Sequence, residues 1–215
     1  MKRAVVFDLD GTLADTIVDL AAAVDRSLRR RNLPPHDLAA YRHMIGDGFR
    51  HLVTRALPLE LRNEAAIEEL RAEAAAYYAE HCLDSTAPYP GVPELLAALA
   101  ERGVARAVLS NKPHELSLKV VGGLFAPGSF AIVRGETAAF PRKPDPTSAL
   151  DITARLGVSP AETLYLGDSD VDMATARAAG MTALGAAWGF RGTDELTAAG
   201  ADAVLAVPGE LLKYL

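Results

Sequence analysis

The sequence predicts an α/β protein with a Rossmann-like parallel sheet and an all-helical domain inserted after the first strand. Short apolar runs alternate with helical stretches along most of the chain, which is the order expected of parallel strands joined by helices. The runs are continuously apolar, as is typical of strands covered on both faces. Half of the 215 residues are hydrophobic, which is enough for one full core and a smaller second module.

Five apolar runs are interpreted as strands of this sheet. They are residues 4–7, 105–109, 130–133, 163–166 and 182–187. Helices are expected between them at residues 93–101, 115–121, 146–156 and 172–179. Gly180 follows the last of these helices and suits its C-terminal end, because glycine adopts the left-handed conformation with little strain.

The exception to the alternation is the segment 16–87, which contains helical stretches and no strand-like run. The expected helices are residues 17–30, 48–57 and 60–82. Prolines separate them, and Pro-Tyr-Pro-Gly at 88–91 marks the return to the sheet. We therefore expect a core domain of residues 1–15 and 88–215 and a helical cap domain of residues 16–87.

Composition and charge exclude several classes of protein. The 22 Lys and Arg residues stand against 28 Asp and Glu, for a net charge of −6, and no basic run interleaved with aromatics offers a nucleic-acid footprint. Cys82 is the only cysteine, which fits a reducing compartment. No apolar run is long enough to span a membrane. We expect a cytoplasmic monomer or homodimer that acts on a small molecule.

Polar residues follow three of the predicted strands, and ligands of open parallel sheets bind beyond the carboxyl ends of strands. These segments are residues 8–12, 110–112 and 167–172, and a fourth polar loop covers residues 142–146. Clustered carboxylates repel one another unless a cation joins them. An all-oxygen set of this kind favours Mg²⁺. Lys143 and the backbone N–H groups of residues 9–11 are suited to hold phosphate oxygens.

The motifs resemble those of the haloacid dehalogenase-like phosphatases. Asp8-Leu9-Asp10-Gly11-Thr12-Leu13 resembles the first motif of the family, and Ser110, Lys143 and the segment 167–172 resemble the other three in the expected order. The resemblance covers essentially the whole chain, with residues 16–87 matching the helical cap of some members. Ser110-Asn111-Lys112-Pro113 and the general layout are most similar to the phosphoglycolate phosphatase-type branch.

The resemblance implies a covalent mechanism centred on two carboxylates. Asp8 would be the nucleophile that attacks phosphorus, because a carboxylate intermediate divides one difficult hydrolysis into two easier steps. Asp10 would protonate the leaving alcohol and then act as the base for the hydrolytic water. Its backbone carbonyl would also bind the metal. General acid–base catalysis of this kind contributes roughly 10²–10⁴-fold in rate.

The resemblance also implies residues that bind phosphate and metal. Ser110, Asn111 and Lys143 would bind the phosphate group. Asp168 would complete the Mg²⁺ site with Asp8 and Asp10. Asp172 would orient water molecules and Lys143 from outside the metal shell. Supporting roles are assigned to Thr12 and Asp172.

Four residues outside the assigned site have a simpler structural interpretation. Asp15 or Thr16 is expected to be the N-cap of the first cap helix. Asp170 is expected only to begin the helix that follows it, where its negative charge meets the positive helix end. Arg50 follows a flexible Gly-Asp-Gly segment, so either it binds a substrate carboxylate or it is solvated.

The function expected is Mg²⁺-dependent hydrolysis of a small phosphate monoester, with 2-phosphoglycolate as the candidate ester. A sugar phosphomutase of the same superfamily and a non-catalytic, receiver-like phosphate-binding protein are the alternatives. Dehalogenation fits poorly, because it requires neither Asp10 nor Asp168. A phosphonate hydrolase would need a cap lysine, and residues 16–87 contain none. A receiver domain would lack the insert and would carry its phosphoacceptor after a later strand.

Overall fold

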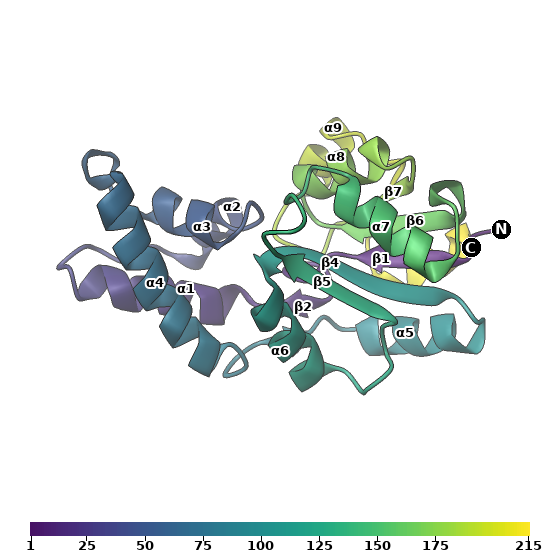
Figure 1. The fold of residues 1–215 in the computed structure, drawn as a ribbon, viewed down its shortest axis with the longest axis horizontal. Coiled ribbons are helices and arrows are strands. Elements are labelled where there is room, and N and C mark those ends of the chain that lie inside the picture. Colours follow the sequence, from purple (N-terminus) through teal and green to yellow (C-terminus); the bar gives the residue numbers. More distant parts are fainter. The chain divides into compact units, whose positions relative to one another are not determined.

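The computed structural model describes residues 1–215 and contains a six-stranded sheet in the order β5-β4-β1-β6-β7-β8 (Figure 1). Every pairing in this sheet is parallel. The predicted α/β fold with a parallel sheet is therefore confirmed. The strands are β1 (Ala4–Phe7), β4 (Ala105–Pro113), β5 (Ile132–Glu136), β6 (Thr163–Gly167), β7 (Thr182–Ala186) and β8 (Ala203–Leu205).

The chain divides into two compact units. Unit 1 consists of residues 1–15 and 88–215 and holds the sheet, and unit 2 is Thr16–Ala87. Two short strands, β2 (Ala14–Asp15) and β3 (Ala87–Pro88), pair where the chain passes between the units. No helix combines the length and the apolar character that a membrane span requires.

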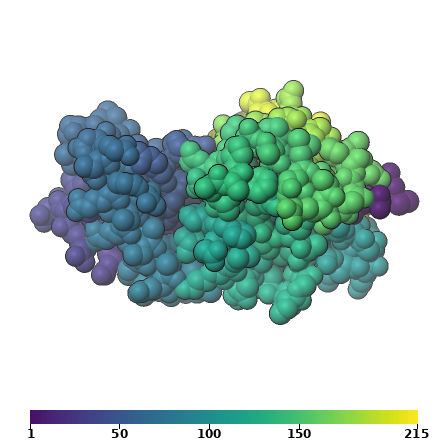
Figure 2. Space-filling view, in the orientation of Figure 1, coloured from purple at the N-terminus to yellow at the C-terminus, as the bar shows by residue number.

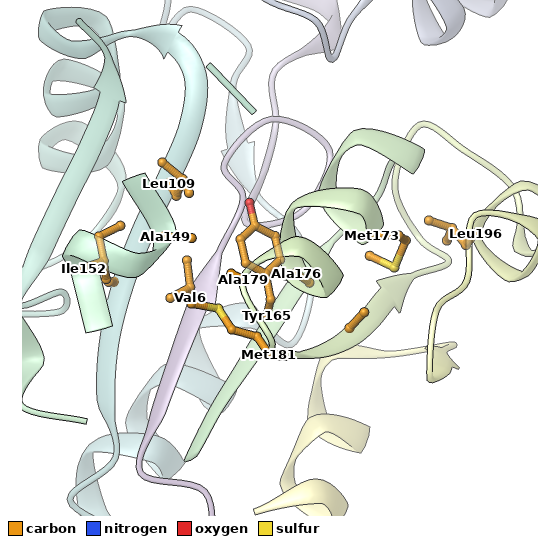
Figure 3. Close-up of a cluster of buried hydrophobic side chains, with 12 residues drawn as sticks. Val6, Leu109, Ala149, Ile152, Tyr165, Met173, Ala176, Ala179, Met181 and Leu196 are labelled. Atoms are coloured by element: carbon orange, nitrogen blue, oxygen red, sulfur yellow. The ribbon is translucent and has the colours of Figure 1, made fainter. Parts of the chain in front are cut away.

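In unit 1, helices cover both faces of the sheet (Figure 1). They are α5 (Val92–Glu101), α6 (His114–Leu124), α7 (Thr147–Leu156), α8 (Asp170–Ala178) and α9 (Thr193–Ala198). The core beneath α7, α8 and α9 is built from side chains such as Val6, Ile152, Tyr165, Met173 and Leu196 (Figure 3). The strands of such a sheet have no solvent-exposed polar face, because helices cover both sides of the sheet.

Strand β4 is longer than predicted. It continues from Leu109 through Ser110, Asn111 and Lys112 to Pro113, with an irregular register against β5 between Leu109 and Pro113. The polar residues taken as the loop after the strand are thus part of it. The elements β8 and α9 were not predicted, because three to six residues provide too little periodicity to identify.

The regular structure of unit 2 is helical, apart from Ala87, which belongs to β3. Its helices are α1 (Ile17–Arg29), α2 (Leu38–Met44), α3 (Phe49–Ala56) and α4 (Glu64–His81), with a 3₁₀ turn at Leu59–Leu61. Figure 2 shows atoms of unit 2 in the purple-to-blue part of the colour scale. Buried residues such as Leu28, Tyr41, Leu70 and Tyr78 form its core.

The ends of the helices in unit 2 differ in detail from the predictions. Thr16 occupies the N-cap position of α1 as expected, but its side chain makes no capping hydrogen bond. Helix α4 begins at Glu64 rather than at residue 60, because the Asn63 side chain accepts a hydrogen bond from the backbone of Ala66. The short helix α2 was not predicted, although Asp37 caps it in the same way.

Candidate active site

The carboxyl ends of β1, β4 and β6 bring the predicted site residues together. Strand β1 lies between the other two, and Phe7 is in register with Val108 on one side and with Leu166 on the other. Asp8 therefore lies level with Leu109 and Gly167, and Ser110 and Asp168 are the next residues of the two neighbouring segments. The side chains of Asp8, Ser110 and Asp168 are buried. This is the edge at which open α/β sheets bind ligands.

Lys143 joins two carboxylates at the centre of the site. Its Nζ atom lies 2.9 Å from Oδ1 of Asp8 and 2.7 Å from Oδ1 of Asp172. Burial alone would lower the pKa of Lys143, but the charges of Asp172 and Asp8 outweigh it and hold that pKa well above its ordinary value. The lysine is therefore a fixed positive charge in the site.

Asp172 is surrounded by hydrogen-bond donors. Its Oδ1 atom also accepts a hydrogen bond from the Tyr165 hydroxyl at 3.1 Å. Its Oδ2 atom accepts bonds from the backbone N–H of Ser169 at 3.2 Å and from the Ser169 hydroxyl at 2.6 Å. These four contacts saturate both oxygens, so the geometry favours Asp172 as the residue that orients Lys143.

Asp168 follows β6, and a backbone N–H and a hydroxyl group position its side chain. The N–H group of Phe190 donates to Oδ2 of Asp168 at 2.7 Å, and the Thr12 hydroxyl is 3.4 Å from its Oδ1. The Trp188 indole donates to the carbonyl of Thr12 at 3.0 Å. The segment after β7 thus holds Asp168 in place.

Three carboxylates in this site are close enough to hold a metal ion. Oxygen atoms of Asp8, Asp168 and Asp172 lie within 4.8 Å of one another. Because Asp172 already accepts four hydrogen bonds, Asp8 and Asp168 are the better placed ligands. The donors are all oxygen, as Mg²⁺ prefers. The residues present therefore fit this metal.

The carboxylates also carry an electrostatic signature of a cation site. Burial, together with the charge of Asp172, raises the pKa of Asp8 to about 7, although Lys143 acts in the opposite direction. Burial and the charges of Asp172 and Asp8 likewise raise the pKa of Asp168 well above its ordinary value. In the absence of a cation these groups are therefore difficult to ionise together.

Asp10 lies at the edge of this group and pairs with a residue that was not predicted as part of the site. The Nζ atom of Lys112 is 2.7 Å from Oδ1 of Asp10. Both side chains are largely shielded from solvent, with 3% of Lys112 and 13% of Asp10 exposed. Lys112 belongs to the Ser110–Pro113 segment that resembles the family, but the sequence around a lysine gives no sign of a partner about a hundred residues away.

Asn111 has contacts that differ from those expected of a phosphate ligand. Its side-chain Oδ1 accepts a hydrogen bond from the backbone N–H of Lys143 at 2.9 Å, and its Nδ2 donates to the Lys143 carbonyl at 3.2 Å. The Lys143–Pro144 peptide bond is cis. The geometry favours Asn111 as the residue that positions the Lys143 loop, whereas the buried Ser110 hydroxyl accepts a hydrogen bond from the N–H of Lys112 at 3.2 Å.

Two other residues also have defined places in the structure. Asp170 is the first residue of α8 and is exposed, as expected for a residue that only begins the helix. Arg50 lies in unit 2, where its guanidinium is 2.6 Å from Glu64 and 3.6 Å from Glu68. The Arg50 guanidinium is therefore paired within its own unit.

The sequence analysis did not assign Ser169 and Tyr165 to the site. Ser169 and Asp172 form a capping box, which is a pattern that the sequence displays.

Buried carboxylates and a lysine at the edge of a parallel sheet are the arrangement expected of a haloacid dehalogenase-like hydrolase. Comparison with known families supports this assignment. The model of the haloacid dehalogenase-like hydrolases matches residues 5–186. The chain belongs to this family. The resemblance of its motifs to those of the family is confirmed.

The individual relatives within this family are phosphatases. Phosphoglycolate phosphatase of Pseudomonas putida is 36% identical over 193 residues, which cover 88% of this chain and 71% of that protein. N-acetylmuramic acid 6-phosphate phosphatase of Pseudomonas aeruginosa is 34% identical over 215 residues, or 99% of this chain and 94% of that protein.

A solved structure from Lactobacillus delbrueckii subsp. bulgaricus, assigned to the phosphoglycolate phosphatases, superposes with a TM-score of 0.93 at 30% identity. The match covers 100% of this chain and 98% of that one. These relatives confirm the predicted enzyme class, a phosphoric monoester hydrolase of the phosphoglycolate phosphatase-like branch.

Proposed function

We propose that this protein is a Mg²⁺-dependent phosphatase that hydrolyses a small phosphate monoester through an aspartyl-phosphate on Asp8. The observation that carries this proposal is the position of the Asp8 carboxylate. It stands at the end of the central strand β1, with Lys143 at 2.9 Å and Asp168 within the range of a shared metal ion. A nucleophile, a positive charge and a metal site thus converge on one point.

The residues of the site divide the chemistry between them. The Asp8 carboxylate attacks phosphorus, and hydrogen bonds to its Oδ1 from Lys143 and from the N–H of Leu9, at 2.7 Å, hold it in place. Lys143 and Ser110 bind the phosphate oxygens as negative charge develops on them. Asp10 donates a proton to the leaving alcohol and later removes one from the attacking water.

The metal assigned to this site is Mg²⁺, and the side chains of Asp8 and Asp168 with the carbonyl of Asp10 are its proposed ligands. When bound, the ion neutralises the carboxylates and stabilises charge on the transferring phosphoryl group. Asp172 contributes from outside this set, because it orients Lys143 through a 2.7 Å ion pair.

The substrate that the relatives favour is 2-phosphoglycolate, with N-acetylmuramic acid 6-phosphate as the second candidate. A relative active on each lies at a similar level of identity, 36% and 34%. The phosphate-binding groups do not discriminate between the two, since they contact only the phosphate. The family leaves no support for the non-catalytic, receiver-like alternative.

Unit 2 is the proposed cap and the proposed source of substrate specificity. The buried carboxylates and lysines described above all belong to unit 1. Their proposed roles concern only the phosphate group and the reacting oxygen atoms. The remainder of the ester must be recognised by other residues, and the helical insert of residues 16–87 is their proposed source. Inserts of this kind also exclude water during phosphoryl transfer when they close.

Phosphate release from a panel of esters tests the proposal. The panel contains 2-phosphoglycolate, N-acetylmuramic acid 6-phosphate, sugar phosphates and nucleotides, each with Mg²⁺ and with EDTA. We expect release that requires Mg²⁺, with one ester strongly preferred. Asp8→Asn should fold normally and show no turnover, and wild-type rates in this variant would exclude the covalent route. Transfer of phosphate to a second hydroxyl of a sugar, without release, would instead indicate the mutase alternative.

A further inference from the structure

The ion pair between Lys112 and Asp10 is a second buried charge pair in the site, distinct from the contacts of Lys143. Its 2.7 Å separation is that of a charge-assisted hydrogen bond. Such a pair is weak evidence for a role in stability, because desolvation of the two charges offsets most of their attraction. Because the carboxylate of this largely buried pair is the proposed general acid, the pair calls for a functional explanation.

The backbone of Lys112 is held firmly at the end of β4. Its N–H donates to the Ser110 hydroxyl at 3.2 Å, and its carbonyl accepts a bond from the Ser117 hydroxyl of α6 at 3.3 Å. The carbonyl also lies so close to Gly135 of β5 that a side chain there would collide with it. The lysine stem therefore starts from a rigid point.

The backbone of Asp10 is equally well defined. It lies in a tight turn in which the Leu9 carbonyl accepts bonds from the N–H groups of Thr12, Leu13 and Ala14, at 3.3, 3.0 and 3.0 Å. The main freedom of Asp10 is thus the rotation of its own side chain. A charged partner 2.7 Å away selects one rotamer of that side chain.

We propose that Lys112 is a positioning residue that holds the Asp10 carboxyl group in the orientation required for proton transfer to and from the reacting oxygens. This inference rests on the proposed function, in which Asp10 is the general acid and base. Misplacement of a catalytic group by about 1 Å can lower a rate by about 10²-fold. Ser110, Asn111 and Lys112 then serve three neighbouring parts of one site: phosphate, the Lys143 loop and Asp10.

The leaving group of the substrate provides the test. Lys112→Met removes the ammonium and keeps the length of the side chain, and Lys119→Met removes an exposed lysine of α6 as a matched control. We expect Lys112→Met to lower kcat/KM about 100-fold for an alkyl ester such as 2-phosphoglycolate. For p-nitrophenyl phosphate, whose leaving group needs little help from an acid, we expect a loss below about tenfold. Lys119→Met should match the wild type with both esters.

A double-mutant cycle distinguishes positioning from direct substrate binding. If Lys112 acts through Asp10, Lys112→Met should have little further effect in the Asp10→Asn background. Inhibition by inorganic phosphate should also be the same in Lys112→Met and in the wild type. Equal losses for both esters, additive effects in the cycle or weaker inhibition by phosphate would overturn the inference and make Lys112 a substrate-binding residue.

A second variant and the activity of the wild type separate failure of this inference from failure of the proposed function. Should Lys112→Met unfold, Lys112→Arg keeps the charge, and we expect it to lose less activity with the same dependence on the leaving group. An equal response of the two esters in that variant would contradict positioning. If the wild type released phosphate from no ester, the proposed function itself would fail. An active wild type with an unaffected Lys112→Met would overturn only this inference.

Discussion

The ammonium nitrogen of Lys143 lies 2.9 Å from Oδ1 of Asp8, and each side chain is more than nine-tenths buried. The contact brings the proposed nucleophile and the proposed phosphate-binding charge together before any substrate arrives. Asp172 also holds the lysine in this position, through a second contact of 2.7 Å. The site is therefore preorganised, and its charges depend on one another.

Replacement of Lys143 should show this dependence directly. Lys143→Met leaves Asp8 and Asp172 buried without their common cation, and breaking a buried pair from one side typically lowers the free energy of unfolding by about 3–5 kcal/mol. Urea unfolding in EDTA measures this loss, with Lys119→Met as the exposed control. Phosphate release should fall by at least about 10²-fold. A variant as stable and active as the wild type would show that the pair has neither role.

Gly11 should be irreplaceable because of its neighbours as well as its backbone. It has φ +81°, and a Cβ atom there would collide with the Asp168 carboxylate and the Phe190 ring. Gly128 has φ +83° with open space around it, so Gly128→Ala isolates the backbone strain of about 1–3 kcal/mol. We expect Gly11→Ala to be less stable than Gly128→Ala and to need more Mg²⁺ for half-maximal activity. Equal unfolding free energies for the two variants would rule out the collision.

A buried carboxylate should matter for the stability of unit 2. Asp19 of α1 accepts hydrogen bonds from the N–H of Ser85 at 3.0 Å, and from the N–H and hydroxyl of Thr86 at 2.9 and 2.7 Å. These bonds join the first helix of the insert to its last residues. Asp19→Asn replaces an acceptor oxygen by a donor, and we expect a loss of about 1–3 kcal/mol in unfolding free energy. Asp170→Asn, at an exposed helix start, should change it by less than about 1 kcal/mol.

The parts of the site that sequence could predict are those that follow from sheet geometry. Asp8 and Asp168 each follow an apolar run, and the ends of neighbouring parallel strands necessarily meet. Lys143 is different, because its position depends on a loop that Asn111 holds through two hydrogen bonds. The polar loop 142–146 made Lys143 a candidate, but sheet geometry alone did not predict its place, and the resemblance to a family supported it.

The remaining site residues could not be predicted from the sequence, for specific physical reasons. Tyr165 lies within an apolar strand, where its ring predicts burial and hides the hydroxyl that bonds to Asp172. Lys112 reaches Asp10 across 102 positions of sequence. Short elements such as β8 could not be predicted, because three residues are too few to show a periodic pattern.

The last prediction concerns pH and follows from the raised pKa of Asp8. Its ordinary value of 3.8 applies to the unfolded chain, whereas in the folded protein the pKa is about 7. Between about pH 4 and about pH 7 the folded state therefore keeps a proton that the unfolded chain releases. The stability that this group contributes is complete below about pH 4 and is lost as the pH rises through about 7. Each unit of difference in pKa corresponds to about 1.4 kcal/mol.

Urea unfolding of the metal-free wild type and of Asp8→Asn measures this contribution. The wild type should lose stability relative to the variant, which does not titrate, as the pH rises from about 4 to about 7. Mg²⁺ binds the ionised carboxylates, so it should stabilise the wild type more at about pH 8 than at about pH 5. A difference between the two proteins that is independent of pH would mean that Asp8 ionises normally in the folded state. Stabilisation by Mg²⁺ that is larger at low pH would mean that the ion binds elsewhere, because protons compete with a cation for these carboxylates.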